Sequence, residues 1–217
     1  LVSGIRFDDY SDFGNAVNPR AALIWATTDT ITTKLLYGRA FRAPSLNELY
    51  VANNPVTMGN TDLGAETIDT FEIAVSHQLN AQLFYGINLF YYEIDDLITA
   101  VAVTGPVSQE YRNSEERTGH GGEIELSYSP VDEVKLTANY AYQKSTDERN
   151  NSGVGEAPNH QLYGRMEWSV SPIWKLATQV NWVGEQKRVA SDPRSPVDDY
   201  ATVDLTLRAV DVLPDWT

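Results

Sequence analysis

The side chains in this sequence that could do chemistry are few. His77, His120 and His160 lie far apart along the chain, and cysteine is absent, which excludes thiolate metal sites, disulfides and a cysteine nucleophile. The glycine clusters at 119–122 and 153–155 lack the strand-to-helix pattern that a phosphate-binding loop requires. The sequence therefore predicts no catalytic residue, no metal site and no cofactor.

Paired carboxylates are the second candidate for chemistry. The group Asp8, Asp9 and Asp12 and the pair Asp95 and Asp96 supply oxygen ligands of the kind that Ca²⁺ prefers. Neither group has the ligand order or the glycine of an EF-hand loop. Solvated charge on exposed loops is the favoured interpretation, and calcium binding by these loops stays open.

The charge balance excludes one class of partner. The chain has 16 Lys and Arg against 30 Asp and Glu, a net charge of −14, and its basic residues are scattered singly. Nucleic-acid binding needs clustered Lys and Arg, so no nucleic-acid partner is expected. No apolar run reaches the roughly 20 residues of a membrane helix. The 12 Tyr, 5 Trp and 6 Phe argue for a folded chain.

The elements that must position these residues follow a period of two. Apolar and polar side chains alternate over segments of about nine to eleven residues, the length of a tilted membrane strand. About ten strands are predicted, near 1–7, 17–27, 30–40, 67–79, 82–91, 118–128 and 134–142, and around Leu162–Trp168, Leu176–Trp182 and Val203–Leu207.

The predicted connections alternate between long and short. The long ones are 8–16, 41–65, 94–116, 146–158 and 185–198, and the short ones are 28–29, 80–81, 129–132 and 171–172. Long loops on one rim and short turns on the other are typical of an outer-membrane barrel. A soluble sandwich, which also alternates with period two, has no reason to segregate them.

Aromatic residues on the apolar parity fall into two bands. Tyr85, Tyr128, Trp168 and Trp174 lie beside short turns, whereas Tyr37, Tyr91, Tyr142 and Trp182 lie beside long loops. Amphipathic rings favour the two headgroup levels of a membrane. The predicted fold is therefore all-β, an antiparallel up-and-down transmembrane β-barrel.

Four stretches of the sequence resemble one family. Residues 37–50, YGRAFRAPSLNELY, are similar to the YGxxFRAPSLxELY run of TonB-dependent outer-membrane receptors, and 59–67 resembles their GNPxLKPET loop, with Thr61, Gly64 and Ala65 at its Pro, Lys and Pro positions. Residues 84–98 are similar to their LFYxDxxDLI stretch. Asn113, Gly119, Gly122 and Glu123 resemble the NxGxAxxxGxE pattern.

This resemblance implies a barrel of 22 strands filled by an N-terminal plug that contacts TonB. Residues 1–217 would then be a partial barrel domain of about ten strands, without the plug and the last strands. The implied protein is not an enzyme but a receptor in the bacterial outer membrane. Its partners would be outer-membrane lipid, TonB through a plug that is not in this chain, and a small ligand such as a ferric siderophore, haem or cobalamin, which it takes into the periplasm.

The resemblance also suggests two sets of site residues. Polar and aromatic residues of the long loops would bind the ligand: Arg42, Asn47, Tyr50, Asn53, Asn54, Tyr111, Arg112 and Arg188. Charged residues on the polar parity would line the lumen and face the plug, or else form a wet barrel wall without a partner: Glu72, Glu123, Glu125, Lys135, Arg165, Glu167, Lys175 and Arg208.

Two rival interpretations make different demands. A small closed barrel acting as an outer-membrane protease or lipase needs a carboxylate within hydrogen-bond reach of His120 or His160. A soluble sandwich adhesin needs its apolar strand residues, such as Leu89, Leu126, Leu176 and Leu205, to be sealed between two facing layers.

Overall fold

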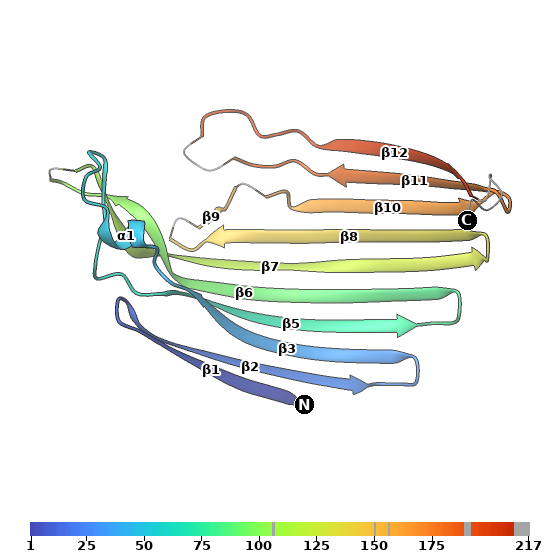
Figure 1. Ribbon diagram of the computed structural model, residues 1–217, viewed down its shortest axis with the longest axis horizontal. Helices are drawn as coiled ribbons and strands as arrows, with labels where there is room; N and C mark the ends of the chain where they lie inside the picture. The colour runs from blue at the N-terminus through green and yellow to red at the C-terminus, as the bar shows by residue number, and fades with distance from the viewer. Residues whose placement is uncertain (106, 150, 156, 189–191, 211–217) are drawn as a thin grey trace, which may run out of the picture.

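A computed structural model describes residues 1–217 except 106, 150, 156, 189–191 and 211–217. Figure 1 shows one broad, curved sheet whose strands follow one another in chain order. The path is β1 (Val2–Tyr10), β2 (Gly14–Ala26), β3 (Ile31–Arg42), β5 (Glu66–Gln78), β6 (Leu83–Ala102), β7 (Gln109–Val131), β8 (Val134–Asp147), β10 (His160–Ser169), β11 (Trp174–Val183) and β12 (Tyr200–Ala209).

Three short elements lie off this path at the long-loop rim. Helix α1 (Leu46–Tyr50) and strand β4 (Thr57–Met58) lie between β3 and β5, and β9 (Ser152–Gly153) pairs with the end of β8. The ten-strand antiparallel meander expected from the alternation is confirmed. Strands β1 and β12 end the path, and among the described residues neither pairs with a further strand.

Two of the predicted long loops are wrong. Residues 8–16 form a tight hairpin, because the β1–β2 ladder continues to the pair Tyr10 and Gly14 and leaves only 11–13 as the turn. Most of 94–116 is also strand, since β6 runs to Ala102 and β7 starts at Gln109. A bulge between Ile94 and Leu97 interrupts this ladder without ending it. Backbone pairing continues there although the side chains no longer alternate.

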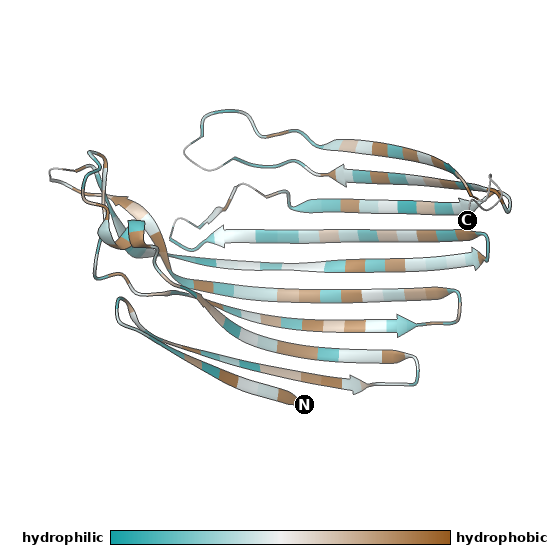
Figure 2. Ribbon diagram, viewed as in Figure 1, coloured by the Kyte–Doolittle hydropathy of each residue, from teal (hydrophilic) through white to brown (hydrophobic). Residues whose placement is uncertain are grey.

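The strand registers sort side chains onto two faces, as the alternation predicts. Leu35 lies opposite Ile73, which lies opposite Leu89, and the same face continues to Leu176 and Leu207 at the other end of the sheet. Figure 2 shows the resulting alternation of hydrophobic and hydrophilic residues along individual strands. One face of the sheet is therefore predominantly apolar and the other predominantly polar.

The apolar face is open. Leu89 is 53% exposed and Leu205 is 72% exposed, while Leu126 is also exposed and Leu176 is half-buried. Among the described residues no second sheet covers this face. The sandwich alternative is wrong, because it requires these leucines to lie between two layers.

A small core forms at the long-loop rim instead. Leu49 of α1, Leu63 of the following loop and Ile98 of β6 are buried together, and Tyr111 of β7 packs against them. This cluster holds the segment between β3 and β5 against β6 and β7 at the long-loop rim. Among the described residues, no helix has the length and apolar character needed to cross a membrane.

Candidate functional site

The rim segment after β3 starts with a capped helix. Ser45 is the N-cap of α1: its hydroxyl accepts a hydrogen bond from the Glu48 N–H group at 3.3 Å, and its own N–H donates to Glu48 Oε2 at 2.7 Å. These two hydrogen bonds satisfy the backbone N–H groups of Ser45 and Glu48, which would otherwise have no partner within the five-residue helix. The Ser-x-x-Glu spacing in the sequence is the local signal for it.

Arg42 ties this helix to the sheet. Its guanidinium donates to both oxygens of Glu66 at 2.5 Å and to both oxygens of Glu48 at 3.0 and 3.1 Å. Glu66 is only 6% exposed, and its Oε1 also accepts the Ile98 N–H bond at 2.7 Å. The three side chains, which we call the Arg42 clamp, join β3, α1, β5 and β6. Sequence reasoning missed Glu48 and Glu66.

The loop ending at 59–65 is joined to β7. The Asn113 side chain donates to Gly64 O at 3.1 Å and accepts the Gly64 N–H bond at 2.9 Å, and Asn60 Nδ2 donates to Tyr111 O at 3.0 Å. A Cβ on Gly59 would lie 2.7 Å from Leu49 O, so this position admits only glycine. These contacts give a physical reason for the glycine and asparagine residues of the sequence motif.

The predicted ligand-binding residues differ in their freedom to bind. Asn47, Tyr50 and Asn53 are exposed, and within the described residues their side chains have no hydrogen-bond partner. Asn54 is occupied, because its Oδ1 accepts the N–H bonds of Val56 and Thr57 at 2.8 and 3.2 Å. The first three are thus available on one exposed turn.

The remaining candidates are engaged or distant. Arg42 is held in its clamp, Tyr111 is half-buried in the rim core, and Arg112 pairs with Glu110 at 2.6 Å. Arg188 donates to Ser195 O at 2.7 Å in the loop between β11 and β12. Figure 1 shows this loop at the β12 end of the long-loop rim, whereas α1 lies beside the middle strands of the same rim. The structure therefore brings the α1 and β7 candidates together and leaves Arg188 apart.

Two rim carboxylates have shifted acidities. Burial by itself would raise the pKa of Glu48, but the hydrogen bonds from Arg42 and from Ser45 outweigh burial and leave that pKa below its ordinary value. Hydrogen bonds from the Arg194 side chain and backbone likewise lower the pKa of Asp192. Both groups favour the ionised form at the rim.

The charged row predicted for the lumen lies on the polar face. The registers place all eight of its residues on one side of the sheet, with Lys135 opposite Glu167 and Lys175 opposite Arg208. Within the row, Arg165 bonds Glu167 at 3.0 Å, and Lys175 Nζ donates to Ser169 Oγ at 2.8 Å. Other polar residues outside the predicted row lie on the same face: Lys34, Asn88, Asn139, Gln179 and Asp204.

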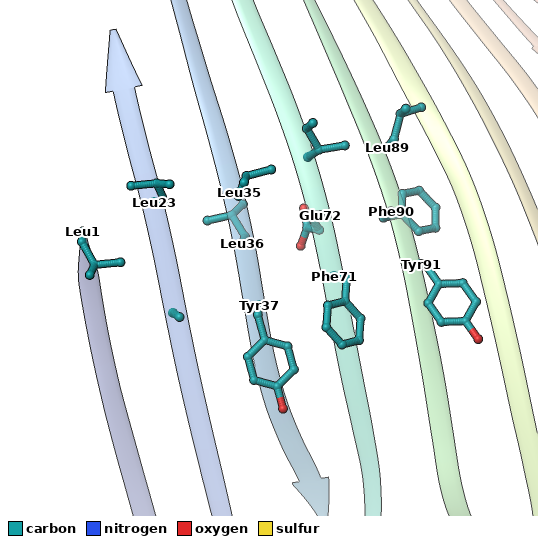
Figure 3. Close-up of a pocket in the computed structure, with 12 residues that line it drawn as sticks. Leu1, Leu23, Leu35, Leu36, Tyr37, Phe71, Glu72, Leu89, Phe90 and Tyr91 are labelled. Atoms are coloured by element: carbon teal, nitrogen blue, oxygen red, sulfur yellow. The ribbon is translucent and has the colours of Figure 1, made fainter. Parts of the chain in front are cut away.

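The opposite face carries a shallow apolar groove of about 690 Å³. Figure 3 shows Leu23, Leu35 and Leu89 along it, with the aromatic rings of Tyr37, Phe71 and Tyr91 toward one end. Most of its lining belongs to the apolar face, and Glu72 of the charged row also lines it, together with Leu36 and Phe90. It has the composition expected of a surface in contact with hydrocarbon.

The demands of the enzyme alternative are not met. His77 Nδ1 and His160 Nδ1 bond the hydroxyls of Tyr85 and Tyr140 at 2.8 and 2.7 Å, and the His120 ring packs beside Tyr142. In the part of the chain that the structure describes, no carboxylate bonds His120 or His160. No group of three or more potential metal ligands occurs among the described residues.

Comparison with known proteins gives the same fold. The chain is 27% identical over 208 residues to the ferrienterobactin receptor of Escherichia coli, covering 86% of this chain and 28% of the relative. It is 25% identical over 215 residues to a vitamin B12 transporter of Vibrio cholerae, covering 96% of this chain and 31% of the relative. The chain thus spans about a third of the length of these relatives.

Solved structures extend the comparison. The siderophore receptor PirA of Acinetobacter baumannii superimposes with a TM-score of 0.81 at 18% identity, over 94% of this chain and 36% of that one. A variant of the Pseudomonas aeruginosa ferric enterobactin receptor in complex with enterobactin also gives 0.81, at 21% identity, over 94% and 34% of the two chains. The family model described as TonB dependent receptor-like, beta-barrel matches residues 1–217, and the chain therefore belongs to the TonB-dependent receptor β-barrel family.

Proposed function

We propose that this chain forms part of the wall of an outer-membrane receptor that binds a scarce ligand outside the cell and passes it into the periplasm. The observation that carries the proposal is the two-faced sheet of a TonB-dependent receptor family member, with its long connections at one rim. The apolar face contacts lipid hydrocarbon, and the polar face lines the lumen. The rim that carries α1 faces the outside of the cell.

The proposed ligand is a ferric siderophore, with cobalamin and haem as the alternatives. Similar proteins are named for ferrienterobactin and for vitamin B12, which supports this range of ligands. On the α1 turn, Tyr50 offers an exposed ring for stacking, and Asn47 and Asn53 offer amides for hydrogen bonding. The Arg42 clamp holds this turn in place and is not itself free to bind.

Release of the ligand requires a plug and an energy source that belong to the family rather than to these residues. The charged row on the polar face hydrogen-bonds the plug, and TonB moves the plug to open the path. The row supports this role because its side chains lie on one face of the sheet and include Glu123 and Glu125, whose carboxylates have no partner among the described residues. The similar proteins are receptors and transporters, and we assign no catalytic step to this chain.

A growth assay tests the proposal. The complete receptor is expressed in an iron-starved bacterium that lacks its own siderophore receptors, and ferric enterobactin, cobalamin and haem are supplied in turn. Growth with the ferric chelate is expected, together with quenching of tryptophan emission in the purified receptor. Folded receptor in the outer membrane that responds to none of the three contradicts the proposal.

Matched variants then locate the binding site. Tyr50→Ala is expected to lower the ligand affinity, measured by tryptophan quenching, by about tenfold, the loss typical of a binding hot spot. Tyr128→Ala removes a ring that is also exposed but lies beside a short turn at the opposite rim, and it should leave binding unchanged. Equal losses in the two variants would remove the α1 turn as the site.

A further inference from the structure

The wall of the sheet opens between β2 and β3. Their ladder ends at the pair Arg20 and Gly38, although β2 continues beside β1 to Gly14 and β3 continues beside β5 to Arg42. Figure 1 shows the β1–β2 hairpin diverging from β3 toward the long-loop rim. Above Gly38 the two strands are therefore no longer joined by ladder hydrogen bonds.

Aromatic rings close this opening at the end that lies beside the β1–β2 hairpin tip. Tyr10 and Phe13 at the hairpin tip stack at 4.5 Å, and Phe41 of β3 lies 6.1 and 6.4 Å from them. Between this cluster and the last ladder pair lies a cavity of about 370 Å³. We call it the β2–β3 window, and its lining includes Gly4, Arg6, Asn18, Arg20, Arg39 and Phe41.

The carboxylates near the window are already occupied. Asp8 accepts two hydrogen bonds from Arg6, at 2.9 and 2.6 Å, and one from Asn18 Nδ2 at 3.3 Å. Asp69 is held by Arg39 at 2.5 to 3.0 Å and by Tyr37 at 2.7 Å. Among the residues that the structure describes, no carboxylate belongs to the lining itself. In a chain of net charge −14, this is a local excess of positive charge.

Arg20 is the arginine of the window lining whose guanidinium is not paired with a carboxylate in the described part of the chain. It is exposed, and among the described residues its guanidinium has no hydrogen-bond or ion-pair partner. Its side chain extends along Gly4 of β1, where a Cβ would lie 3.2 Å from Arg20 Nε. The glycine thus provides the space in which the guanidinium lies beside the window.

We propose that the β2–β3 window binds a phosphate-type oxyanion on Arg20. The planar guanidinium fork matches two oxygens of such a group, and charge-assisted bonds of this kind are stronger than neutral ones. Asn18 also lines the window, and its Oδ1 is a buried acceptor without a partner in the described part of the chain. A hydrogen phosphate supplies a donor for that acceptor, which a fully ionised oxyanion does not.

The same chemistry has two sources, a phosphate ion in solution and the phosphate group of a membrane amphiphile. Inorganic phosphate titrated calorimetrically into the complete receptor in detergent probes the first. The second is probed by native mass spectrometry of receptor from neutral nanodiscs with and without phosphatidic acid. Saturable phosphate binding or retained phosphatidic acid, lost in either case with Arg20→Gln, supports the site and identifies its source.

Variants separate a built site from general attraction between charges. Arg20→Gln is expected to weaken binding by about tenfold or more, the loss of a charge-assisted pair, and Arg20→Lys by less. Gly4→Val keeps every charge but displaces the guanidinium, and it should also weaken binding. Arg208→Gln is the control, because Arg208 is an exposed arginine on the same face with no partner among the described residues.

Several results would overturn the proposal. Equal phosphate affinity in the parent receptor and Arg20→Gln removes the site, as does an equal loss in Arg208→Gln. Sulfate binding as tight as phosphate binding would contradict the assigned role of Asn18. Each variant is first checked for a folded barrel by its heat-dependent mobility on gels. None of these readouts requires transport, so they are independent of the uptake assay.

Discussion

At the residue scale, position in a contact network separates binding side chains from structural ones. Arg42 is an arginine at the end of β3, where the long rim segment begins, which makes it a reasonable candidate for contact with a ligand. Its guanidinium is nevertheless shared between Glu48 and Glu66, whereas Tyr50 of the following helix α1 is exposed. Side-chain type selects both residues, and only their neighbours distinguish them.

Removing Glu66 should release the rim segment without unfolding the wall. In Glu66→Ala, Arg42 loses one of its two carboxylates and the buried Ile98 N–H loses its acceptor, a loss of about 1–3 kcal/mol of local stability. Hydrogen exchange of residues 43–65 is expected to become faster, with the ladders of β5 and β6 unchanged. Glu125→Ala, which removes a carboxylate without an ion pair among the described residues, should leave the exchange unchanged. Unchanged exchange in both variants contradicts the clamp.

Acid should loosen the same segment through Glu48. Because the folded-state pKa of Glu48 is lowered, the ionised form stabilises the fold, and this contribution is complete above the ordinary carboxylate pKa. It is lost as the pH falls through the lowered pKa of the folded state. Limited proteolysis within 43–65 should therefore accelerate as the solution is acidified through that range. Glu48→Gln should show a weaker dependence on pH, and an equal dependence would exclude Glu48 as the titrating group.

At the element scale, the sequence predicts strands well wherever two different solvents face the two sides of the sheet. Leu35, Ile73 and Leu89 follow strict alternation, and the registers place them on one face. In the proposed membrane placement, both faces contact water beyond the apolar band, so alternation fades while the ladder continues. That is why the extensions of β6 to Ala102 and of β7 from Gln109 were predicted as loop.

The candidate site was less predictable than the strands. The resemblance located the segment around 37–67, but Glu66 lies 24 residues from Arg42, and no local pattern joins them. Arg20 is a similar case, because its lack of a partner depends on where the β2–β3 ladder ends. These contacts depend on how distant strands pair, so no short stretch of sequence predicts them.

A charge placed on the apolar face tests the assignment of the two faces. Leu89→Arg should destabilise the receptor by about 2–4 kcal/mol, the cost of an arginine facing lipid near the bilayer midplane. Asn88→Arg, one residue away on the polar face beside Glu72 and Glu123, should cost far less. Equilibrium unfolding of the complete receptor in lipid vesicles measures both. Equal costs would mean that both faces contact the same medium.

At the scale of the whole molecule, the sheet has two free edges in the described chain. The outer sides of β1 and β12 present backbone donors and acceptors, and a membrane offers no water to satisfy them. The isolated 217-residue chain is therefore expected to associate edge to edge in detergent. Light scattering coupled to size-exclusion chromatography measures its mass. A stable monomer would show that the edges are satisfied within one chain.

The last rung of the β3–β5 ladder, Arg42 opposite Glu66, has a consequence for how such proteins diversify. It fixes both ends of the intervening segment at one point of the wall. Lengthening or replacing that segment then costs mainly closure entropy, about 0.6 kcal/mol for each doubling of its length. A lineage, or an engineer, can thus exchange the segment between 43 and 65 while the rest of the scaffold stays as it is.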